Sequence, residues 1–176
     1  MQPDPTLSDT QARVERQPAT LRFMLSHPVH IASLGFGSGL SPIMPGTCGT
    51  LFGWAAFAVL QPWLSNTAWA LLILIGFLAG IGFCGFTARR MNVPDPGPVV
   101  WDEVIAIWLV LWLAAPTGFA AQLLAFAVFR FFDMVKPPPI RWFDQRLKGG
   151  FGIMFDDIVA AFFALLVLAI GNRLFG

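Results

Sequence analysis

The feature that most constrains this chain is a long central stretch that carries no charge. Residues 32–88 contain no Asp, Glu, Lys or Arg. Of the 176 residues, 56% are hydrophobic and 12% are charged, whereas about 25% are charged in ordinary soluble domains. So few charges could not cover the surface of a soluble protein of this size. We therefore expect lipid to be the solvent for much of the chain.

Five apolar segments follow a polar N-terminus, and they predict an all-α fold. They cover residues 47–60, 67–88, 99–114, 119–134 and 153–170. A helix that crosses the hydrocarbon needs about 20 apolar residues, and about 17 is the lower limit. Only the second segment clearly reaches this length, so the short first and third segments are tilted, re-entrant or buried within the bundle. The number of complete spans is left open.

The chain divides into a tail and a membrane domain. Residues 1–22 mix charge, Pro and Thr, which predicts a flexible polar cytoplasmic tail. Residues 23–176 are predicted to form a compact bundle of about five to six helices, several of which span the membrane. Within this domain, the mildly apolar residues 23–34 are expected to form a short cytoplasmic interfacial helix.

The charges of the loops predict how the bundle is oriented. Residues 61–66 and 115–118 carry no charge, whereas residues 89–98 and 135–150 contain several Lys and Arg. Positively charged loops remain in the cytoplasm. If all five segments cross the membrane, the two kinds of loop alternate as this rule requires, with the N-terminus inside. The net charge of the whole chain is only +1, so we predict no nucleic-acid partner.

Five acidic residues are predicted to gather at the cytoplasmic end of the bundle. Two begin the third segment, one ends the fourth and two begin the fifth; they are Asp102, Glu103, Asp133, Asp156 and Asp157. Carboxylates at the edge of hydrocarbon cost free energy unless they are paired, so they usually mark function. They would repel one another, and a divalent cation would remove that repulsion. Because Mg²⁺ prefers oxygen ligands of this kind, the acids predict a Mg²⁺ site.

Each acid, taken alone, also has a simpler explanation. Asp102 and Asp156 lie near helix starts, where an acidic side chain stabilises the helix. Arg130 precedes Asp133 by three residues, a spacing that permits an ordinary pair within one helix. These explanations suit single residues better than all five together, so we favour the metal site.

A glycine-rich stretch leads into the first apolar segment from the same side as the acids. Its sequence, GFGSGLSPIMPGTCGT, covers residues 35–50. Glycines expose backbone N–H groups and let an anion approach closely, especially at a helix start. The stretch would also serve as a turn into the membrane, and its place beside the acids favours phosphate binding. Lys136 and Arg141 could pair with a phosphate or with lipid headgroups.

Two further patterns carry less weight. Residues 84–90, CGFTARR, have the Cys-x5-Arg spacing of cysteine-dependent phosphatases, but they end an apolar segment and have no glycine-rich loop. His27 and His30 are one helical turn apart. Two histidines without further ligands rarely form a metal site, so we expect their rings to pack.

Four motifs, in order, closely resemble those of the phosphatidylglycerophosphatase A family: GFGSGLSPIMPGT, VVWDEVIAIW, FRFFDMVKPPPIRWFD and GGFGIMFDDIVAA. The resemblance implies an all-helical enzyme that uses Mg²⁺ to remove the terminal phosphate of phosphatidylglycerophosphate, giving phosphatidylglycerol. Its partners would be this phospholipid and membrane lipids, at the bacterial inner membrane, with a site facing the cytoplasm. The five acids would be metal ligands and catalytic residues. The residues implied at the phosphate site are Gly37, Ser38, Gly39, Pro45, Gly46 and Thr47, with Lys136 and Arg141 nearby.

Two other functions remain as alternatives. An ion-coupled transporter also contains acids within the membrane and helices broken by Gly or Pro. The acids predicted here collect at one face rather than at the midplane, and no inverted repeat is apparent in the sequence. In a non-catalytic membrane subunit the acids would be dispensable. Transport without phosphate release would favour the first alternative.

Overall fold

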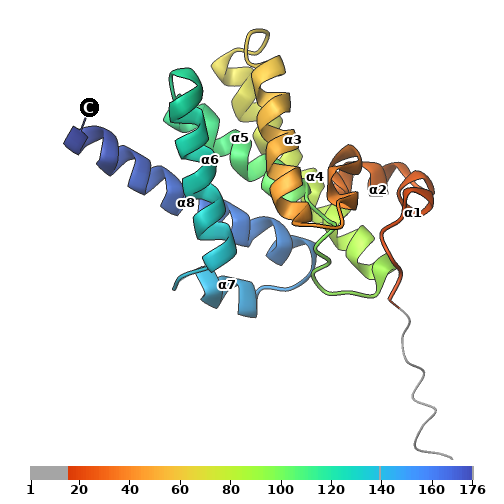
Figure 1. Cartoon of the computed structure of the whole chain (residues 1–176). Coiled ribbons are helices and arrows are strands. Elements are labelled where there is room, and N and C mark those ends of the chain that lie inside the picture. The colour runs from red at the N-terminus through yellow and green to blue at the C-terminus, as the bar shows by residue number, and fades with distance from the viewer. Residues whose placement is uncertain (1–15, 139, 176) are drawn as a thin grey trace, which may run out of the picture.

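The computed structural model describes residues 16–138 and 140–175, and every regular element of this part of the chain is a helix. The all-α prediction is therefore confirmed. Five long helices match the five apolar segments, and shorter helices precede and connect them (Figure 1). In chain order the elements are α1 (Leu21–Leu25), α2 (Pro28–Ser33), η2 (Gly35–Leu40, a 3₁₀ helix), α3 (Pro45–Leu60), α4 (Asn66–Met91), α5 (Trp101–Ala114), α6 (Gly118–Val135), α7 (Ile140–Arg146) and α8 (Gly149–Phe175).

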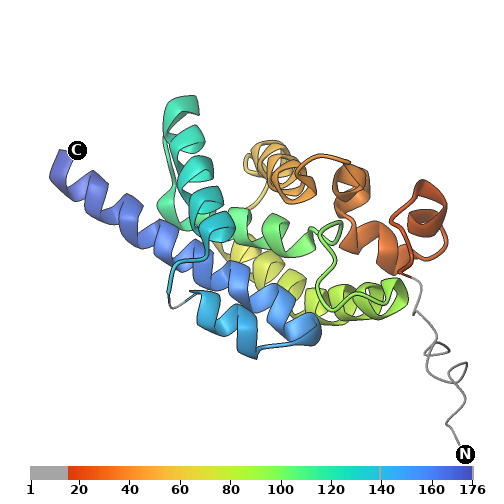
Figure 2. The same ribbon diagram turned by 60° about the horizontal axis from the view of Figure 1, so that its bottom comes forward.

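Helix α5 lies at the centre of the bundle, in contact with α3, α4, α6 and α8 (Figures 1 and 2). Its sequence is apolar on nearly all sides after the first turn, which suits a helix surrounded by other helices. Two of its tryptophan side chains form hydrogen bonds to the neighbouring helices α3 and α4. Trp108 Nε1 donates to Gly53 O of α3 at 2.8 Å, and Trp101 Nε1 donates to Gly76 O of α4 at 3.0 Å. These bonds fix the depth and rotation of α5, whose first turn carries two of the acids.

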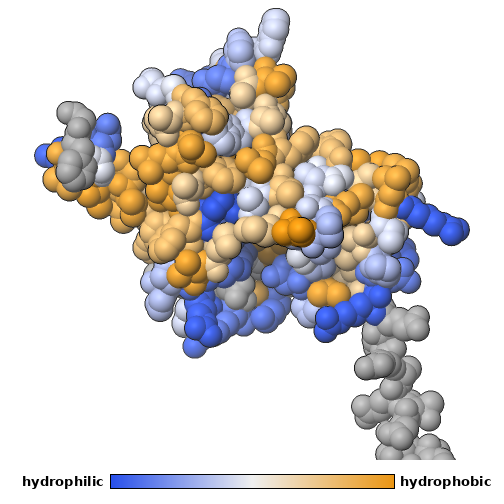
Figure 3. Space-filling view, in the orientation of Figure 1, coloured by the Kyte–Doolittle hydropathy of each residue, from blue (hydrophilic) through white to orange (hydrophobic). Residues whose placement is uncertain are grey.

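Three helices in the described part of the chain are long and apolar enough to cross a membrane. They are α4, α6 and residues Gly149–Leu174 of α8. Apolar side chains such as Ile75 and Phe162, 61% and 62% exposed, cover their outward faces. Figure 3 shows this apolar surface over α6 and α8, with hydrophilic residues gathered near α7. The chain is therefore a membrane protein. Crossing by the shorter α3 and α5, of 16 and 14 residues, stays a prediction.

Helices α4 and α8 approach so closely that their backbones touch. A Cβ atom on Gly85 of α4 would lie 3.1 Å from Gly150 N, and a Cβ on Gly150 would overlap Ile81 O. Small residues permit such contacts between helices in membranes, where close packing joins helices. The contact holds the start of α8, and with it the two acids that follow, against α4.

Replacing Gly150 with alanine should force α4 and α8 apart. We expect Gly150→Ala to lower the free energy of unfolding by about 3 kcal/mol, because backbone atoms cannot move aside cheaply. Gly171→Ala on the same helix is the control, because apart from the neighbouring residues and backbone of its own helix no heavy atom of the described residues lies within 4 Å of the added Cβ. Thermal unfolding in detergent micelles measures both variants. Equal midpoints would contradict the close helix contact.

The N-terminal region adds one feature to its prediction. The expected interfacial helix is divided into α1 and α2, because Pro28 begins the second helix and the His27 side chain caps it. The flexible tail over residues 1–22 stays a prediction; within it, Gln17 N donates to Met91 O at 3.1 Å. Residues 1–15 of that tail lie outside the described residues.

The two histidines pack, as predicted. The His30 ring stacks on Phe23 and Phe86, with ring centroids 4.3 and 5.4 Å apart. Its Nδ1 lies 2.9 Å from Thr87 Oγ1, which joins α2 to α4. Burial, and to a smaller extent the charge of His27, lowers the pKa of His30. The ring is therefore neutral at pH 7, as a buried side chain with a hydroxyl partner should be.

Candidate active site

The crossing of α5 and α8 brings three acids together. Asp102 and Glu103 come from the first turn of α5, and Asp157 comes from an early turn of α8. One side-chain oxygen of each lies within 4.8 Å of the others. Asp102 and Asp157 are buried, with Asp157 only 3% exposed, and the Glu103 side chain is 12% exposed. The structure thus produces part of the convergence predicted from the order of the apolar segments, and we call this set the acidic triad.

The acidic triad could hold a metal ion. Asp102 Oδ1, Glu103 Oε2 and Asp157 Oδ2 are buried and have no hydrogen-bond partner among the described residues. A buried polar atom without a partner costs free energy, and repulsion between the carboxylates adds to that cost. A divalent cation would satisfy these oxygens together. The residues present therefore fit a bound metal ion.

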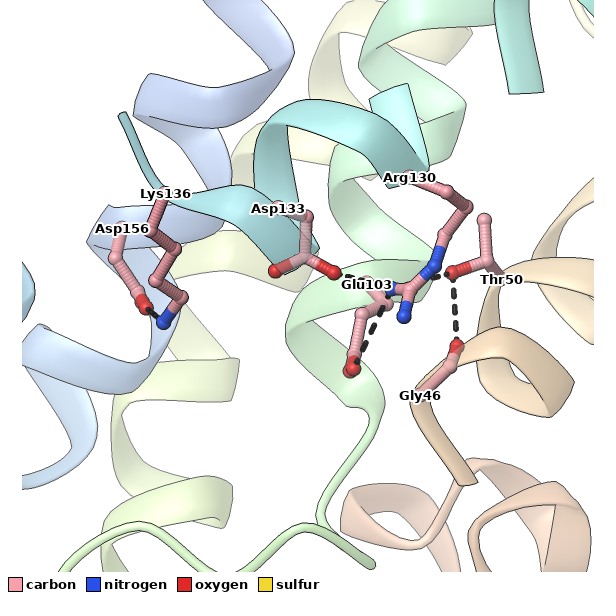
Figure 4. A network of polar contacts seen from close by, with 7 residues as sticks. All are labelled: Gly46, Thr50, Glu103, Arg130, Asp133, Lys136 and Asp156. Carbon is pink, nitrogen blue, oxygen red and sulfur yellow. Dashed lines mark hydrogen bonds and ion pairs between the residues drawn. The ribbon is translucent and has the colours of Figure 1, made fainter. Parts of the chain in front are cut away.

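Asp133, at the end of α6, lies beside the acidic triad and is paired with Arg130 (Figure 4). The nitrogen that pairs with Asp133, Arg130 Nη1, also lies 3.9 Å from Glu103 Oε1 and donates to Thr50 Oγ1 of α3 at 3.3 Å. Asp133 is close enough to Glu103 and Asp157 to repel both carboxylates. Arg130 therefore joins α3, α5 and α6 next to the acids.

Asp156 faces a different direction from Asp157. Successive residues of a helix point about 100° apart, and Asp156 forms an ion pair with Lys136 (Figure 4). Lys136 ends α6 with a left-handed backbone, φ 43°. A pocket of about 150 Å³ lies beside Asp156 and is also lined by Asp95 and Lys148. Asp156 thus lies next to this pocket, paired with Lys136 and outside the acidic triad.

The first turn of α3 also reaches the site. Pro45, Gly46 and Thr47 form this turn, and the side chain of Met44 before it does not cap the helix. The N–H groups of a first turn have no partner within the helix. A Cβ on Gly46 would overlap Glu103 Oε1, and Thr47 Oγ1 is buried without a hydrogen-bond partner among the described residues. A helix N-terminus of this kind is suited to bind an anion.

The remaining predicted phosphate-site residues of the glycine-rich stretch are Gly37, Ser38 and Gly39. They lie in η2, where their contacts hold the backbone of η2 together and pack it against the segment before α5. Ser38 Oγ donates to a carbonyl within η2 at 2.8 Å, and a Cβ on Gly39 would overlap Pro98 O in the segment before α5. These contacts help to position the first turn of α5. Phosphate binding by η2, and by Arg141, which is exposed on α7, stays a prediction.

Arg130 and Thr50 are two residues of the site that the sequence patterns do not select. Arg130 is the one cation within residues 119–134, and a cation inside an apolar segment usually has a functional reason. Its spacing from Asp133 instead favours a pair within α6, and that pair does form. Thr50 carries no comparable signal, because hydroxyl side chains are common in membrane helices.

A sequence profile described as phosphatidylglycerophosphatase A matches residues 31–172. The chain belongs to the phosphatidylglycerophosphatase A family. A phosphatidylglycerophosphatase A of Escherichia coli K12 is 46% identical over 143 residues, covering 81% of this chain and 82% of the relative. One of Haemophilus influenzae is 41% identical over 147 residues, covering 84% and 90%. The family resemblance predicted from the four motifs is thus confirmed.

A third relative carries a different name. A putative phosphatidylinositol-3-phosphatase of Bacteroides thetaiotaomicron is 38% identical over 160 residues, which covers 85% of this chain and 96% of the relative. No solved structure is significantly similar to the chain. All the predicted site residues fall within the part that matches the phosphatidylglycerophosphatase A profile.

Proposed function

We propose that this chain is a Mg²⁺-dependent phosphatase that removes the terminal phosphate of phosphatidylglycerophosphate and releases phosphatidylglycerol. The observation that carries the proposal is the acidic triad, with three buried carboxylate oxygens that lack partners among the described residues. Membership of the phosphatidylglycerophosphatase A family supports the reaction and the substrate. Both point to hydrolysis of a phosphate monoester at this end of the bundle.

The donor set favours Mg²⁺ as the ion. Carboxylate oxygens are its usual protein ligands, and it commonly binds one or two carboxylates together with substrate phosphate. The ion would be held by the acidic triad, Asp102, Glu103 and Asp157, with Asp133 beside it. When bound, Mg²⁺ supplies positive charge that neutralises phosphate oxygens during transfer. Asp156 would act through its ion pair with Lys136.

Residues of the chain bind the phosphate and transfer the protons. The N–H groups of Gly46 and Thr47, with the Thr47 hydroxyl, bind the terminal phosphate at the N-terminus of α3. A carboxylate of the site accepts a proton from the attacking water as the water oxygen bonds to phosphorus. The bond between phosphorus and the glycerol oxygen then breaks. That oxygen takes a proton, and the lipid leaves as phosphatidylglycerol.

The location in the membrane is part of the proposal. The apolar faces of α4, α6 and α8 support a multi-pass protein. The basic residues of the loops after α4 and α6 favour a cytoplasmic site, in the inner membrane of a bacterium. The acyl chains of the substrate would stay in the bilayer while its headgroup reaches the first turns of α3 and α5.

The test is phosphate release by the full chain in detergent micelles that contain phosphatidylglycerophosphate. We expect release that rises with Mg²⁺ and stops in excess EDTA, because the acidic triad needs a cation to accept the phosphate. Phosphatidylinositol 3-phosphate is the comparison substrate, chosen because of the Bacteroides relative, and we expect slower release from it. No release from either lipid by folded protein would refute the proposed function, and ion flux in vesicles would then favour transport.

A further inference from the structure

Arg130 is a cation placed almost inside a group of carboxylates. It comes from α6, and its side chain is only 11% exposed. One guanidinium nitrogen, Nη1, makes all the hydrogen bonds and ion pairs of this side chain with described residues, namely Asp133, Glu103 and Thr50. The Nε atom is buried and has no hydrogen-bond partner among the described residues. Nη1 thus holds the guanidinium in place, and Nε remains as a donor without a hydrogen-bond partner among the described residues.

The unused part of the guanidinium faces the N-terminus of α3. The Nη2 atom lies so near the first turn of α3 that a Cβ on Gly46 would be 3.3 Å from it, and Glu103 Oε1 would be nearer still, at 2.3 Å. The absence of a side chain at Gly46 therefore lets this turn approach both the guanidinium and Glu103 closely. Thr47 Oγ1, buried and unpartnered among the described residues, belongs to the same turn. Donors from two helices, α3 and α6, thus lie close together beside Glu103.

The charges near the acidic triad show why a cation is required there. A phosphate monoester carries up to two negative charges, and it must approach Asp102, Glu103, Asp133 and Asp157. Lys136, the other cation of the network in Figure 4, is paired with Asp156. Arginine is suited to the task, because its planar fork binds two phosphate oxygens at once and keeps its charge when buried.

We propose that Arg130 binds the terminal phosphate of the substrate, together with the first turn of α3. The proposal rests on the proposed function, because it assigns a further binding residue to the same site. The guanidinium is held through Nη1 by three positioning residues, Asp133, Glu103 and Thr50. In this position its Nη2 and Nε atoms present two N–H groups to phosphate oxygens. The metal ion held by the acidic triad would neutralise charge on one side of the phosphate, and Arg130 neutralises charge on another side.

The test compares phosphate binding in four full-length proteins: wild type, Arg130→Gln, Arg130→Lys and Gln122→Met. Gln122 Oε1 accepts from Trp54 Nε1 at 2.7 Å, which is another polar link between α3 and α6. Gln122→Met removes that link and leaves the site charges unchanged, so it controls for loosened helix packing. Titration calorimetry with inorganic phosphate in the presence of Mg²⁺ measures binding without turnover. The KM and kcat for phosphatidylglycerophosphate are measured beside it.

We expect Arg130→Gln to weaken phosphate binding by at least about tenfold and to raise KM by a similar factor, because a charge-assisted bidentate contact is lost. Arg130→Lys keeps the charge without the fork, so phosphate binding should weaken by about fivefold. Gln122→Met should bind phosphate as the wild type does. If Arg130→Gln fails to fold, Arg130→Lys decides the question in its place.

Wild-type phosphate affinity in the folded Arg130 variants would overturn the proposal and leave Arg130 as a link between helices. Equal weakening in Gln122→Met would overturn it too, because loosened packing would then explain the loss. Calorimetry separates this proposal from the proposed function. If the wild type binds phosphate through Arg130 and releases none from phosphatidylglycerophosphate, only the reaction is refuted.

Discussion

Asp157→Asn should reduce phosphate release from phosphatidylglycerophosphate by at least about a thousandfold. Asparagine has nearly the shape of aspartate, but it lacks the charge, and one of its two oxygens is replaced by an amide nitrogen. The acidic triad would lose one of its three carboxylates at the point where α5 and α8 cross. Phosphate release at saturating Mg²⁺, with the wild type measured in parallel, gives the ratio.

The stability of the same variant shows whether the loss arises at the metal. A ligand that binds only the folded state raises the unfolding midpoint, so Mg²⁺ should raise the midpoint of the wild type and not that of Asp157→Asn. In EDTA the variant should be at least as stable as the wild type, because one repelling charge is gone. Asp156→Asn, next to it but paired with Lys136, should lose only about tenfold of activity. Nearly normal turnover in Asp157→Asn would remove the acidic triad from the mechanism.

Gly46→Ala should lower phosphate release by about a hundredfold, because misplacing a reacting group by about 1 Å has effects of this size. The added methyl group would overlap Glu103 Oε1 and lie 3.3 Å from Arg130 Nη2. Glu103 must then move within the acidic triad, or the first turn of α3 must move away from it. Steady-state kinetics in micelles measures the change in kcat and KM.

The matched control for Gly46→Ala is Gly82→Ala on α4. Apart from the neighbouring residues and backbone of its own helix, no heavy atom of the described residues lies within 4 Å of a Cβ at Gly82. Alanine is also the better helix former by about 1 kcal/mol, so this variant should be as stable as the wild type or more so, with activity within about twofold. Equal activity in the two alanine variants would mean that the contact of Gly46 with Glu103 is not required.

Much of this fold follows from the sequence because hydrophobic length and charge position are local properties. The five apolar segments correspond to α3, α4, α5, α6 and α8. Because short loops join antiparallel helices, the acids at alternate segment ends had to meet at one end of the bundle. The shortness of the third segment had a physical cause as well, since α5 is enclosed by four other helices. The four motifs that resembled the phosphatidylglycerophosphatase A family were sufficient for the family assignment.

The details of the site depend on rotation about helix axes and on contacts between distant residues. Asp156 and Asp157 are neighbours with the same side chain, and it is the packing of α8 on α5 that turns Asp157, rather than Asp156, toward Asp102 and Glu103. Arg130 could be explained by Asp133 alone, whereas its contact with Thr50 requires α3 to lie beside α6. The division of the N-terminal helix at Pro28 could have been predicted from proline chemistry.

Helix α3 is shorter than the bilayer is thick. Its 16 residues extend over about 24 Å, against about 30 Å of hydrocarbon. Leu51 and Val59 on this helix are 47% and 69% exposed, so its outer face is suited to lipid. If α3 crosses the membrane, as predicted, this hydrophobic mismatch should make the surrounding bilayer thinner. The lipid headgroups beside α3 would then lie closer to the depth of Gly46 and Thr47, which would shorten the path of a phosphate group to the acids. Fluid bilayers with short acyl chains, which need the least thinning, should suit this protein best.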